Sequence, residues 1–345
     1  MNFSASMYKN ASEVLPEKEQ SGSFVFDGEH AHIVLAIYIV TFLTGLPSNL
    51  LAFYAFLVKV RRKPTPVDIL LLNLTISDLV LLMFLPLKMR EAASGMVWNM
   101  PSFLCPLTGF CYFSSIYIST LFLTAVSVER YLGVAFPIKY KLHRKPEYAI
   151  FASVCFWFIA CGHCSIVYIV QYCVDKDAVQ GNETKCYEDF TNDQLKILLP
   201  VRLELGVTLF FIPFTITLFC YINFIRILMC LPNIQKKRKQ RAIGLAIATL
   251  ANFCICFAPY NISHIVGFVN NKSPKWRVDA LLLSTFNATL DPVVFYFTST
   301  TVQKTFFDFV EVILLKLGKI CPCKKFCLSQ GEPPYDDSNL DRSTT

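Results

Sequence analysis

Residues 198–222, LLPVRLELGVTLFFIPFTITLFCYI, join two charged side chains to a long apolar segment. From Val207 to Ile222 no residue carries a charge, and an apolar segment of about 20 residues is long enough to cross a bilayer. Arg202 and Glu204 lie just before it. A charge inside a membrane costs roughly 2.5–3.5 kcal/mol on insertion scales unless a partner satisfies it. The stretch therefore predicts a membrane span whose first turns hold charges with a function.

The composition of the whole chain agrees with a membrane protein. Of its 345 residues, 54% are hydrophobic and only 17% are charged, whereas soluble domains carry about 25% charged residues. The apolar excess is therefore expected to face lipid. Most of the 14 cysteines lie inside apolar runs, where we expect small core residues rather than a disulfide or zinc framework.

Six further apolar runs of similar length accompany the first one, and neither strand-like alternation nor an internal repeat competes with them. The sequence predicts an all-α membrane protein, a seven-transmembrane helix bundle occupying residues 31–299. Prolines inside the runs are expected to kink helices whose freed carbonyl groups are satisfied by neighbours. The predicted spans are residues 31–59, 66–89, 101–135, 146–172, 194–230, 240–269 and 276–299.

Basic residues gather in three short loops, at residues 59–63, 139–145 and 236–241. Lys and Arg are enriched in cytoplasmic loops, so these loops are expected inside, the N-terminus outside and the C-terminus inside. This arrangement predicts a multi-pass protein of the plasma membrane. Cys105 at the start of span 3 and Cys186 in a long outer loop would then face an oxidising compartment, which permits a disulfide between them. Two free thiols are the alternative.

The two ends of the chain are expected to lie outside the bundle. Residues 1–30 are polar and lack the basic and apolar regions of a cleavable signal peptide, so the first span is expected to act as a signal anchor. Residues 300–319 carry apolar side chains at helical spacing, which predicts a short amphipathic helix on lipid of the inner leaflet. Residues 320–345 form a predicted cytoplasmic tail. Predicted modification sites are glycosylation at Asn2, Asn10 and Asn182, and palmitoylation, favoured over a metal cluster, at Cys321, Cys323 and Cys327.

Buried acidic residues predict an ion site in the middle of the bundle. Asp78 lies in span 2 and Asp291 in span 7, with amide and hydroxyl side chains in neighbouring spans. Two buried carboxylates need a proton or a cation to be tolerated, and an allosteric sodium ion is the simplest solution. No other cofactor is expected. The predicted ligands are Asp78, Asn49, Ser119, Asn287 and Asp291.

These features together resemble the rhodopsin-like G-protein-coupled receptors over roughly residues 31–317. The resemblance rests on the seven spans and on Asn49, LTISDL around Asp78, Cys105, Glu129-Arg130-Tyr131, Trp157, Pro213, Tyr221, Pro259 and Asp291-Pro292. It implies a heterotrimeric G protein as partner, with arrestin and receptor kinases, and a sodium ion that stabilises the resting state. The residues implied in G-protein coupling are Glu129, Arg130, Tyr131 and Tyr221; as an isolated feature, Glu129-Arg130 would equally fit a charged pair at the membrane interface.

Three positions depart from the pattern of that family. Phe257 stands where a tryptophan switch is usual, and Phe295 occupies the tyrosine position of the last span's motif. Lys239 replaces an acidic partner that some members offer to the arginine of span 3. The details of the activation switch are therefore left open.

A second polar group is expected at the outer ends of spans 4 to 7. It consists of His163, Arg202, His264 and Arg277, with Tyr260 one helical turn before His264. Two guanidinium groups in one pocket repel each other unless an anion lies between them, and the planar fork of arginine fits a carboxylate. The alternative is that the arginines are neutralised internally by Glu188, Glu204 or Asp279.

Eight segments narrow the resemblance to the short-chain free fatty acid receptors, types 2 and 3: GLPSNLLAF, ERYLGVAFP, GHCSIVYIVQY, CYEDF, LPVRLEL, APYNISHIVG, KSPKWR and DPVVFYF. CYEDFTNDQL leans to type 2, which we favour, while LLNLTISDL and GMVW lean to type 3. The resemblance implies a receptor for acetate, propionate and butyrate that couples to inhibitory G proteins, with calcium mobilisation as an open second branch. The implied carboxylate ligands are Arg202, Arg277 and His264, with Tyr260, His163 and Glu188 lining the pocket.

Three alternatives to a receptor for short-chain acids are a transporter, an enzyme and a receptor for another acid. A carboxylate transporter usually shows internal repeats and an even number of helices, which this chain lacks. A membrane enzyme using His163 and His264 has no supporting nucleophile or metal motif, so no enzyme activity is expected, and no nucleic-acid partner. A receptor of the same group for another acid, such as lactate or a medium-chain fatty acid, is the nearest alternative.

Overall fold

A computed structural model describes residues 28–173, 186, 190–231, 235–298, 302–304, 306–309 and 311. Within these residues the chain is helical and contains no strand. The helices are α1 (Gly28–Arg62), α2 (Pro66–Ala93), α3 (Leu104–Ala135), α4 (Pro137–His143), α5 (Pro146–Cys164), α6 (Ile166–Cys173), α7 (Asn192–Gly206), η2 (Val207–Phe211), α8 (Ile212–Cys230), α9 (Lys236–Asn252), η3 (Phe253–Phe257), α10 (Ala258–Asn270), α11 (Arg277–Thr285) and α12 (Asn287–Thr298).

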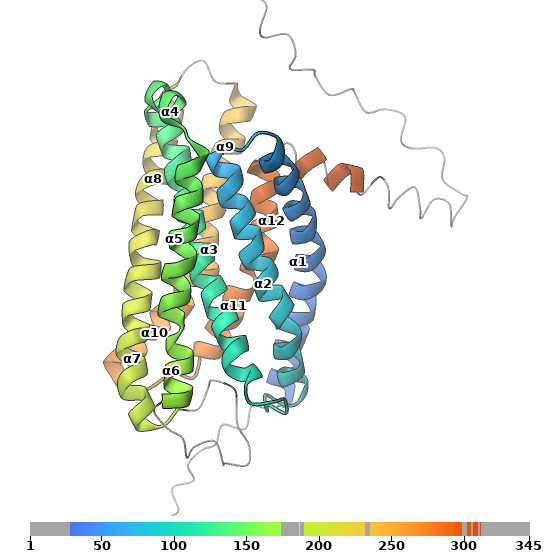
Figure 1. The fold of residues 1–345 in the computed structure, drawn as a ribbon, viewed down its shortest axis with the longest axis vertical. Helices are drawn as coiled ribbons and strands as arrows, with labels where there is room; N and C mark the ends of the chain where they lie inside the picture. Colours follow the sequence, from blue (N-terminus) through green and yellow to red (C-terminus); the bar gives the residue numbers. More distant parts are fainter. Residues whose placement is uncertain are drawn as a thin grey trace, which may run out of the picture.

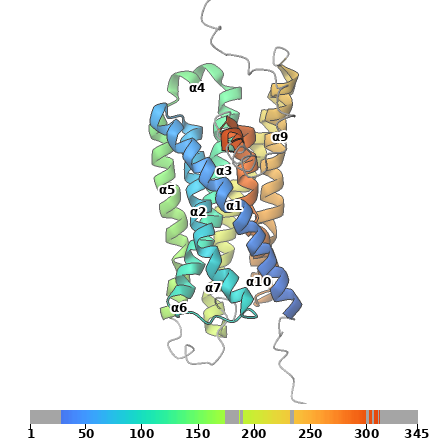
Figure 2. The same cartoon turned by 90° about the vertical axis from the view of Figure 1, so that its right-hand side faces the viewer.

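Seven helical segments of the described chain are long and apolar enough to cross a membrane, which confirms the predicted bundle. Four of them are composite, since α5 continues into α6, α7 through η2 into α8, α9 through η3 into α10, and α11 into α12. The segments stand side by side, with α4 near one end of the bundle and α6, α7 and α10 toward the other (Figures 1 and 2).

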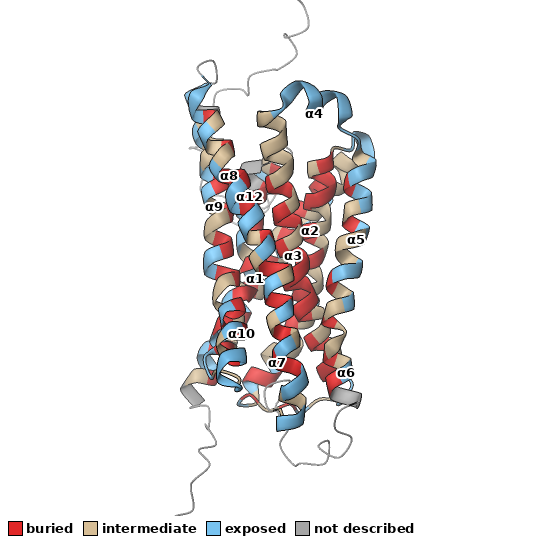
Figure 3. Cartoon of the chain, turned by 90° about the vertical axis from the view of Figure 1, so that its left-hand side faces the viewer, coloured by how far each residue is buried: buried red, intermediate tan, exposed pale blue. Residues whose placement is uncertain are grey.

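The third segment lies at the centre of the bundle. In its most apolar window 72% of the residues are buried, against 22% in the window of the fourth segment. Figure 3 shows the same pattern, with buried residues concentrated on α3 and on the inward faces of its neighbours. The helix α3 packs against α2, α5 and α8. Side chains in the middle of α3 can therefore contact all three helices.

The outer surface of the bundle is apolar over most of its length. Large side chains such as Met83, Phe158 and Leu43 are 69%, 75% and 65% exposed. An apolar surface of this extent does not face water in a soluble protein, and helices satisfy their own backbone groups in lipid. The chain is therefore a multi-pass membrane protein.

Two prolines lie two residues after the ends of short π-helical segments. Pro213 follows η2 and Pro259 follows η3. Proline has no N–H group, and its ring clashes with the carbonyl four residues earlier, so the helix widens there. The carbonyl of Leu209, four residues before Pro213, accepts a hydrogen bond of 2.8 Å from the Thr120 hydroxyl of α3. A neighbouring helix thus satisfies the freed group, as expected.

Several predicted features fall at the ends of the chain. The proposed helix at residues 300–319 is partly described: residues 302–304, 306–309 and 311 are helical, and Phe306, Phe307 and Phe309 are exposed. Asn2, Asn10, Asn182, Cys321, Cys323 and Cys327 lie outside the described residues.

Candidate functional site

Arg202 is held in the second half of α7. The helix begins with a capping box in which Thr191 and Gln194 each accept a hydrogen bond from the other's backbone N–H, at 3.3 and 3.0 Å. The Arg202 side chain is buried, with 5% of the residue exposed. One of its guanidinium nitrogens donates to the Ser273 hydroxyl at 2.9 Å, and the group lies 4.8 Å from the ring centroid of Phe190.

Arg277 is the first residue of α11 and is also buried. Its guanidinium donates to the hydroxyl of Tyr260 at 3.3 Å and lies over two aromatic rings, 5.5 Å from the centroid of Tyr260 and 6.0 Å from that of Phe113. These two rings are stacked on each other. Within the part of the chain that is described, Arg277 forms no ion pair with a carboxylate. Its positive charge is therefore held by aromatic faces and one hydroxyl.

His264 lies within the electrostatic reach of both arginines. Its ring is 2% exposed and packs edge-on against the Tyr260 ring, with centroids 4.5 Å apart. Its Nε2 lies 3.1 Å from the Tyr117 hydroxyl of α3. The charges of Arg277 and Arg202 both act on this imidazole. The structure thus brings Arg202, Arg277, His264 and Tyr260 into one buried cluster, as the sequence predicts.

Two of the three acids that could neutralise this cluster are engaged elsewhere. Glu204 lies 3.1 Å from Nε2 of His163, and Asp279 lies 2.8 Å from Nε2 of His30. The third, Glu188, is outside the described residues. His163 and Glu204 have side chains 37% and 43% exposed. The structure therefore places His163 at a partly exposed contact between α5 and α7, not with the buried arginines.

Arg277 also lines a small cavity. It is lined by side chains from α2, α3 and α11 and by Cys186. Lys88, near the end of α2, contributes a second cationic side chain to its wall. The sequence alone does not indicate a role for Lys88, because FLPLKMRE resembles the ordinary charged end of a membrane span. The lining residues are Lys88, Gly109, Tyr112, Phe113, Cys186, Arg277, Val278 and Leu281.

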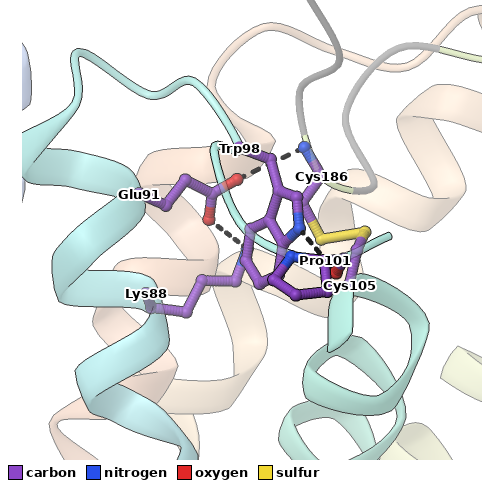
Figure 4. Close-up of a disulfide and its surroundings, with 6 residues drawn as sticks. All are labelled: Lys88, Glu91, Trp98, Pro101, Cys105 and Cys186. Carbon is purple, nitrogen blue, oxygen red and sulfur yellow. Dashed lines mark hydrogen bonds and ion pairs between the residues drawn. A yellow bond between two sulfur atoms is a disulfide. The ribbon is translucent and has the colours of Figure 1, made fainter. Parts of the chain in front are cut away.

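The disulfide between Cys105 and Cys186 is present and confirms the predicted pairing, with the two Cα atoms 5.6 Å apart. It ties Cys186 to the first turn of α3. Figure 4 shows a second tie beside it, in which the backbone N–H of Cys186 donates to Glu91 Oε1 at 3.3 Å. The other oxygen of Glu91 accepts from Lys88 Nζ at 2.8 Å. Glu91 thus connects Cys186 and its disulfide to Lys88 in the cavity wall.

The predicted ion ligands also meet in the structure. Asn287 donates to Asp78 at 3.3 Å and to Asp291 at 3.0 Å, and Ser119 neighbours Asp78. Asn49 donates to the carbonyl of Ala288 at 2.7 Å, directly beside Asn287. Among the described residues, Oδ2 of Asp78 and Oδ1 of Asn49 are buried acceptors without a donor. Two adjacent carboxylates with spare oxygen acceptors are a donor set that suits a hard cation such as sodium.

Asn252 of α9 belongs to this polar group and was not predicted. Its amide donates to Asn287 at 2.6 Å and to Asp291 at 3.1 Å. In the sequence it lies in the apolar run LANFCICF, where a lone amide gives no signal of its own. Asn252 therefore fastens α9 to α12 at the level of the two acids.

At the C-terminal end of α3, Glu129 and Arg130 form no salt bridge with each other in the described part of the chain. Glu129 accepts a hydrogen bond from the Tyr140 hydroxyl of α4 at 2.5 Å. Burial, followed by that bond and by the charge of Glu129, raises the pKa of Tyr140. Arg130 lies near Tyr221, whose hydroxyl donates to Thr249 at 3.5 Å.

Tyr131 of α3 and Lys239 of α9 each contact α8. The Tyr131 ring lies 5.9 Å from the ring of Phe219, centroid to centroid. Lys239, which replaces the acidic partner of other receptors, donates to the carbonyl of Met229 at 2.8 Å. Since Lys239 is cationic, it cannot pair with Arg130 as an acidic side chain would.

Residues 48–295 match the family described as 7 transmembrane receptor (rhodopsin family). The chain belongs to this family of receptors and is not an enzyme. It is 52% identical over 279 residues to Free fatty acid receptor 2 of Rattus norvegicus, covering 80% of this chain and 84% of that protein. To Free fatty acid receptor 3 of Mus musculus it is 49% identical over 282 residues, 82% and 88% of the two chains. To Free fatty acid receptor 1 of Macaca fascicularis it is 33% identical over 278 residues, 75% and 89% of the two.

These comparisons place the chain in the group of free fatty acid receptors 2 and 3 within the rhodopsin-like G-protein-coupled receptors. The similar identities to the two types do not separate them, so the preference for type 2 stays a prediction. The transporter and enzyme alternatives are excluded by the family.

Proposed function

We propose that this receptor is activated by short-chain carboxylates, namely acetate, propionate and butyrate, and that it signals through heterotrimeric G proteins of the inhibitory class, with calcium mobilisation as a second branch. The observation that carries the proposal is the buried Arg277, which forms no ion pair within the described residues and shares its surroundings with Arg202. A buried cation is costly unless an anion joins it.

The chemistry of the cluster favours a carboxylate over other anions. Each guanidinium can donate two parallel hydrogen bonds to the two oxygens of one carboxylate. His264 lies near both arginines and has a buried ring nitrogen, Nδ1, without a partner in the described structure. Tyr260 orients Arg277 through its hydroxyl and the face of its ring. We propose that these residues hold the acid head group and that its alkyl chain packs on the neighbouring aromatic rings.

The size of such a ligand limits its affinity. Acetate has four heavy atoms, and at a ceiling of roughly −1.5 kcal/mol per atom its binding cannot exceed about −6 kcal/mol, or tens of micromolar. Each further methylene group adds about 0.8 kcal/mol if it is buried. A receptor of this kind would report on acids present at high concentration.

Arg277→Ala tests the proposal directly. Loss of a charge-assisted hydrogen bond costs about 1.5–3 kcal/mol, so the EC50 of propionate should rise at least tenfold in a cAMP-inhibition assay, with surface expression measured in parallel. Lys272→Ala is the control, because it removes a positive charge from an exposed position five residues before Arg277. It should leave the EC50 of propionate unchanged. An unchanged EC50 for Arg277→Ala would refute the proposal.

The nearest alternative is a receptor for a longer acid. The comparisons leave it open, because free fatty acid receptors 1, 2 and 3 are named for a fatty acid without its chain length. Dose–response curves for straight-chain acids from C2 to C10 separate the two, because the short-chain proposal requires potency to peak at or below C4. A maximum at C8 or C10 would establish the alternative.

We further propose a sodium ion held by Asp78, Asn49, Ser119, Asn287 and Asp291, and G-protein contact through Glu129, Arg130, Tyr131 and Tyr221. Bound there, sodium would supply a positive charge between the two acids and so link α2 to α12. The basic loops support a plasma-membrane orientation with the N-terminus outside. Arrestin and receptor kinases as partners, glycosylation at Asn2, Asn10 and Asn182, and palmitoylation at Cys321, Cys323 and Cys327 complete the proposal.

A further inference from the structure

The wall of the cavity beside Arg277 contains two cationic residues, and only one of them forms an ion pair within the described residues. Lys88 and Arg277 both line it. Lys88 is paired with Glu91 at 2.8 Å, and their side chains are 12% and 1% exposed. Arg277 has no such partner in the described part of the chain. The charges at the cavity are therefore the neutral ion pair of Lys88 with Glu91 and the positive charge of Arg277.

Glu91 is held beside Lys88 by contacts of both its side chain and its backbone. Oε1 accepts from the backbone of Cys186 and Oε2 from Lys88, so both oxygens are engaged (Figure 4). Its own backbone carbonyl accepts from the N–H of Met96 at 3.0 Å, which closes the turn after α2. Cys186 is in turn held by the disulfide to α3. The position of the negative charge is thus set by four covalent or hydrogen-bonded ties.

We propose that Glu91 is a specificity-determining residue that restricts this receptor to acids with a single carboxylate. The proposal rests on the proposed function, in which the Arg202–Arg277–His264 cluster holds the acid head group. An acid with a second carboxylate would extend it past Arg277 into the cavity, where Lys88 is the available cation. Because Glu91 already neutralises Lys88 and is itself negative, a second carboxylate there lacks a partner and is repelled.

Butyrate and succinate provide a matched pair of probes, since both have four carbons and differ by one carboxylate. Glu91→Gln keeps an oxygen that can accept from Cys186 but removes the charge, so the Lys88 ammonium becomes available to the ligand. At the short distances inside one cavity, releasing a unit charge is expected to lower the EC50 of succinate relative to that of butyrate by at least about tenfold. The double variant Lys88→Gln/Glu91→Gln removes both charges and should return the ratio to that of the unmodified receptor.

Three outcomes would overturn the proposal. One is an unchanged succinate-to-butyrate ratio in Glu91→Gln at normal surface expression. Another is a shift that persists in the double variant, because a merely structural effect of Glu91 would not depend on Lys88. If Glu91→Gln fails to reach the surface, Lys88→Gln makes the opposite charge change. Its unneutralised Glu91 should raise the EC50 of succinate relative to that of butyrate about tenfold, and an unchanged ratio is the third outcome.

Failure of the proposed function would look different. In that case the unmodified receptor would not respond to butyrate at all, and Arg277→Ala would change nothing. A butyrate response that depends on Arg277, together with an unaltered ratio in Glu91→Gln, would reject the role of Glu91 alone.

Discussion

At the scale of single residues, the contact between Tyr117 and His264 joins the central helix to the candidate ligand site. The two side chains are 1% and 2% exposed, and the Tyr117 hydroxyl lies 3.1 Å from Nε2 of His264. Water cannot replace either partner at such burial, so each depends on the other. Tyr117 therefore fixes the orientation in which the imidazole meets the two guanidinium groups.

Tyr117→Phe should weaken the response to propionate without abolishing it. Removing one hydroxyl from a buried pair costs about 1 kcal/mol or more, which corresponds to a rise in EC50 of about fivefold. The control is Tyr54→Phe, the same change at a residue that is 61% exposed on α1. Equal EC50 values for Tyr117→Phe and the unmodified receptor would show that this contact does not orient His264.

At the scale of elements, the π-helical segments η2 and η3 decide which residues of two long helices face the interior. A π-helical turn adds a residue, so the faces before and after it are rotated relative to an uninterrupted α-helix. Arg202 lies before η2 and the Pro213 turn lies after it. Thr120 of α3 secures this widened turn through the carbonyl of Leu209.

Thr120→Val should therefore destabilise the fifth membrane segment. The buried Leu209 carbonyl would lose its donor, at a cost of about 1–3 kcal/mol, and the thermal unfolding temperature of the detergent-solubilised receptor should fall. Thr215→Val is the matched control, because this exposed threonine bonds only within its own helix, to the carbonyl of Phe211 at 2.9 Å. If both variants melt alike, the tie between α3 and η2 contributes no measurable stability.

At the scale of the whole molecule, the seventh membrane segment carries residues of both candidate sites. Its first half, α11, begins with Arg277, and its second half, α12, carries Asn287 and Asp291. Asn252 fastens α9 to these residues. An ion bound between Asp78 and Asp291 would stabilise this arrangement, and a ligand that binds another arrangement better would be opposed by it.

Replacing sodium by choline should therefore increase the apparent affinity of propionate in the unmodified receptor, by up to about tenfold if sodium is present well above its Kd. Asp78→Asn removes one of the two carboxylates and should abolish the dependence on sodium. Asp193→Asn, at an exposed residue paired with Lys196, controls for loss of a negative charge. A sodium effect that survives in Asp78→Asn would argue against an ion at this site.

Much of the fold and part of the site could be predicted from the sequence. The spans follow from the length of apolar runs, and Arg202, Arg277, Asp78 and Asp291 are conspicuous because charges are rare in such runs. Lys88 and Asn252 could not be predicted in the same way. A lysine near the end of a span and a lone amide in an apolar run have ordinary explanations, and only their neighbours in space reveal a site.

The sequence by itself determined that seven helices cross a membrane and that a few charges lie buried among them, because hydrophobicity and charge are properties of the chain read in one dimension. The tertiary structure decided which charges meet. Glu204 pairs with His163, and Asp279 contacts His30. Arg277 lies over the rings of Phe113 and Tyr260. These partners depend on how each helix is rotated, and that rotation is set by packing between residues distant in the sequence.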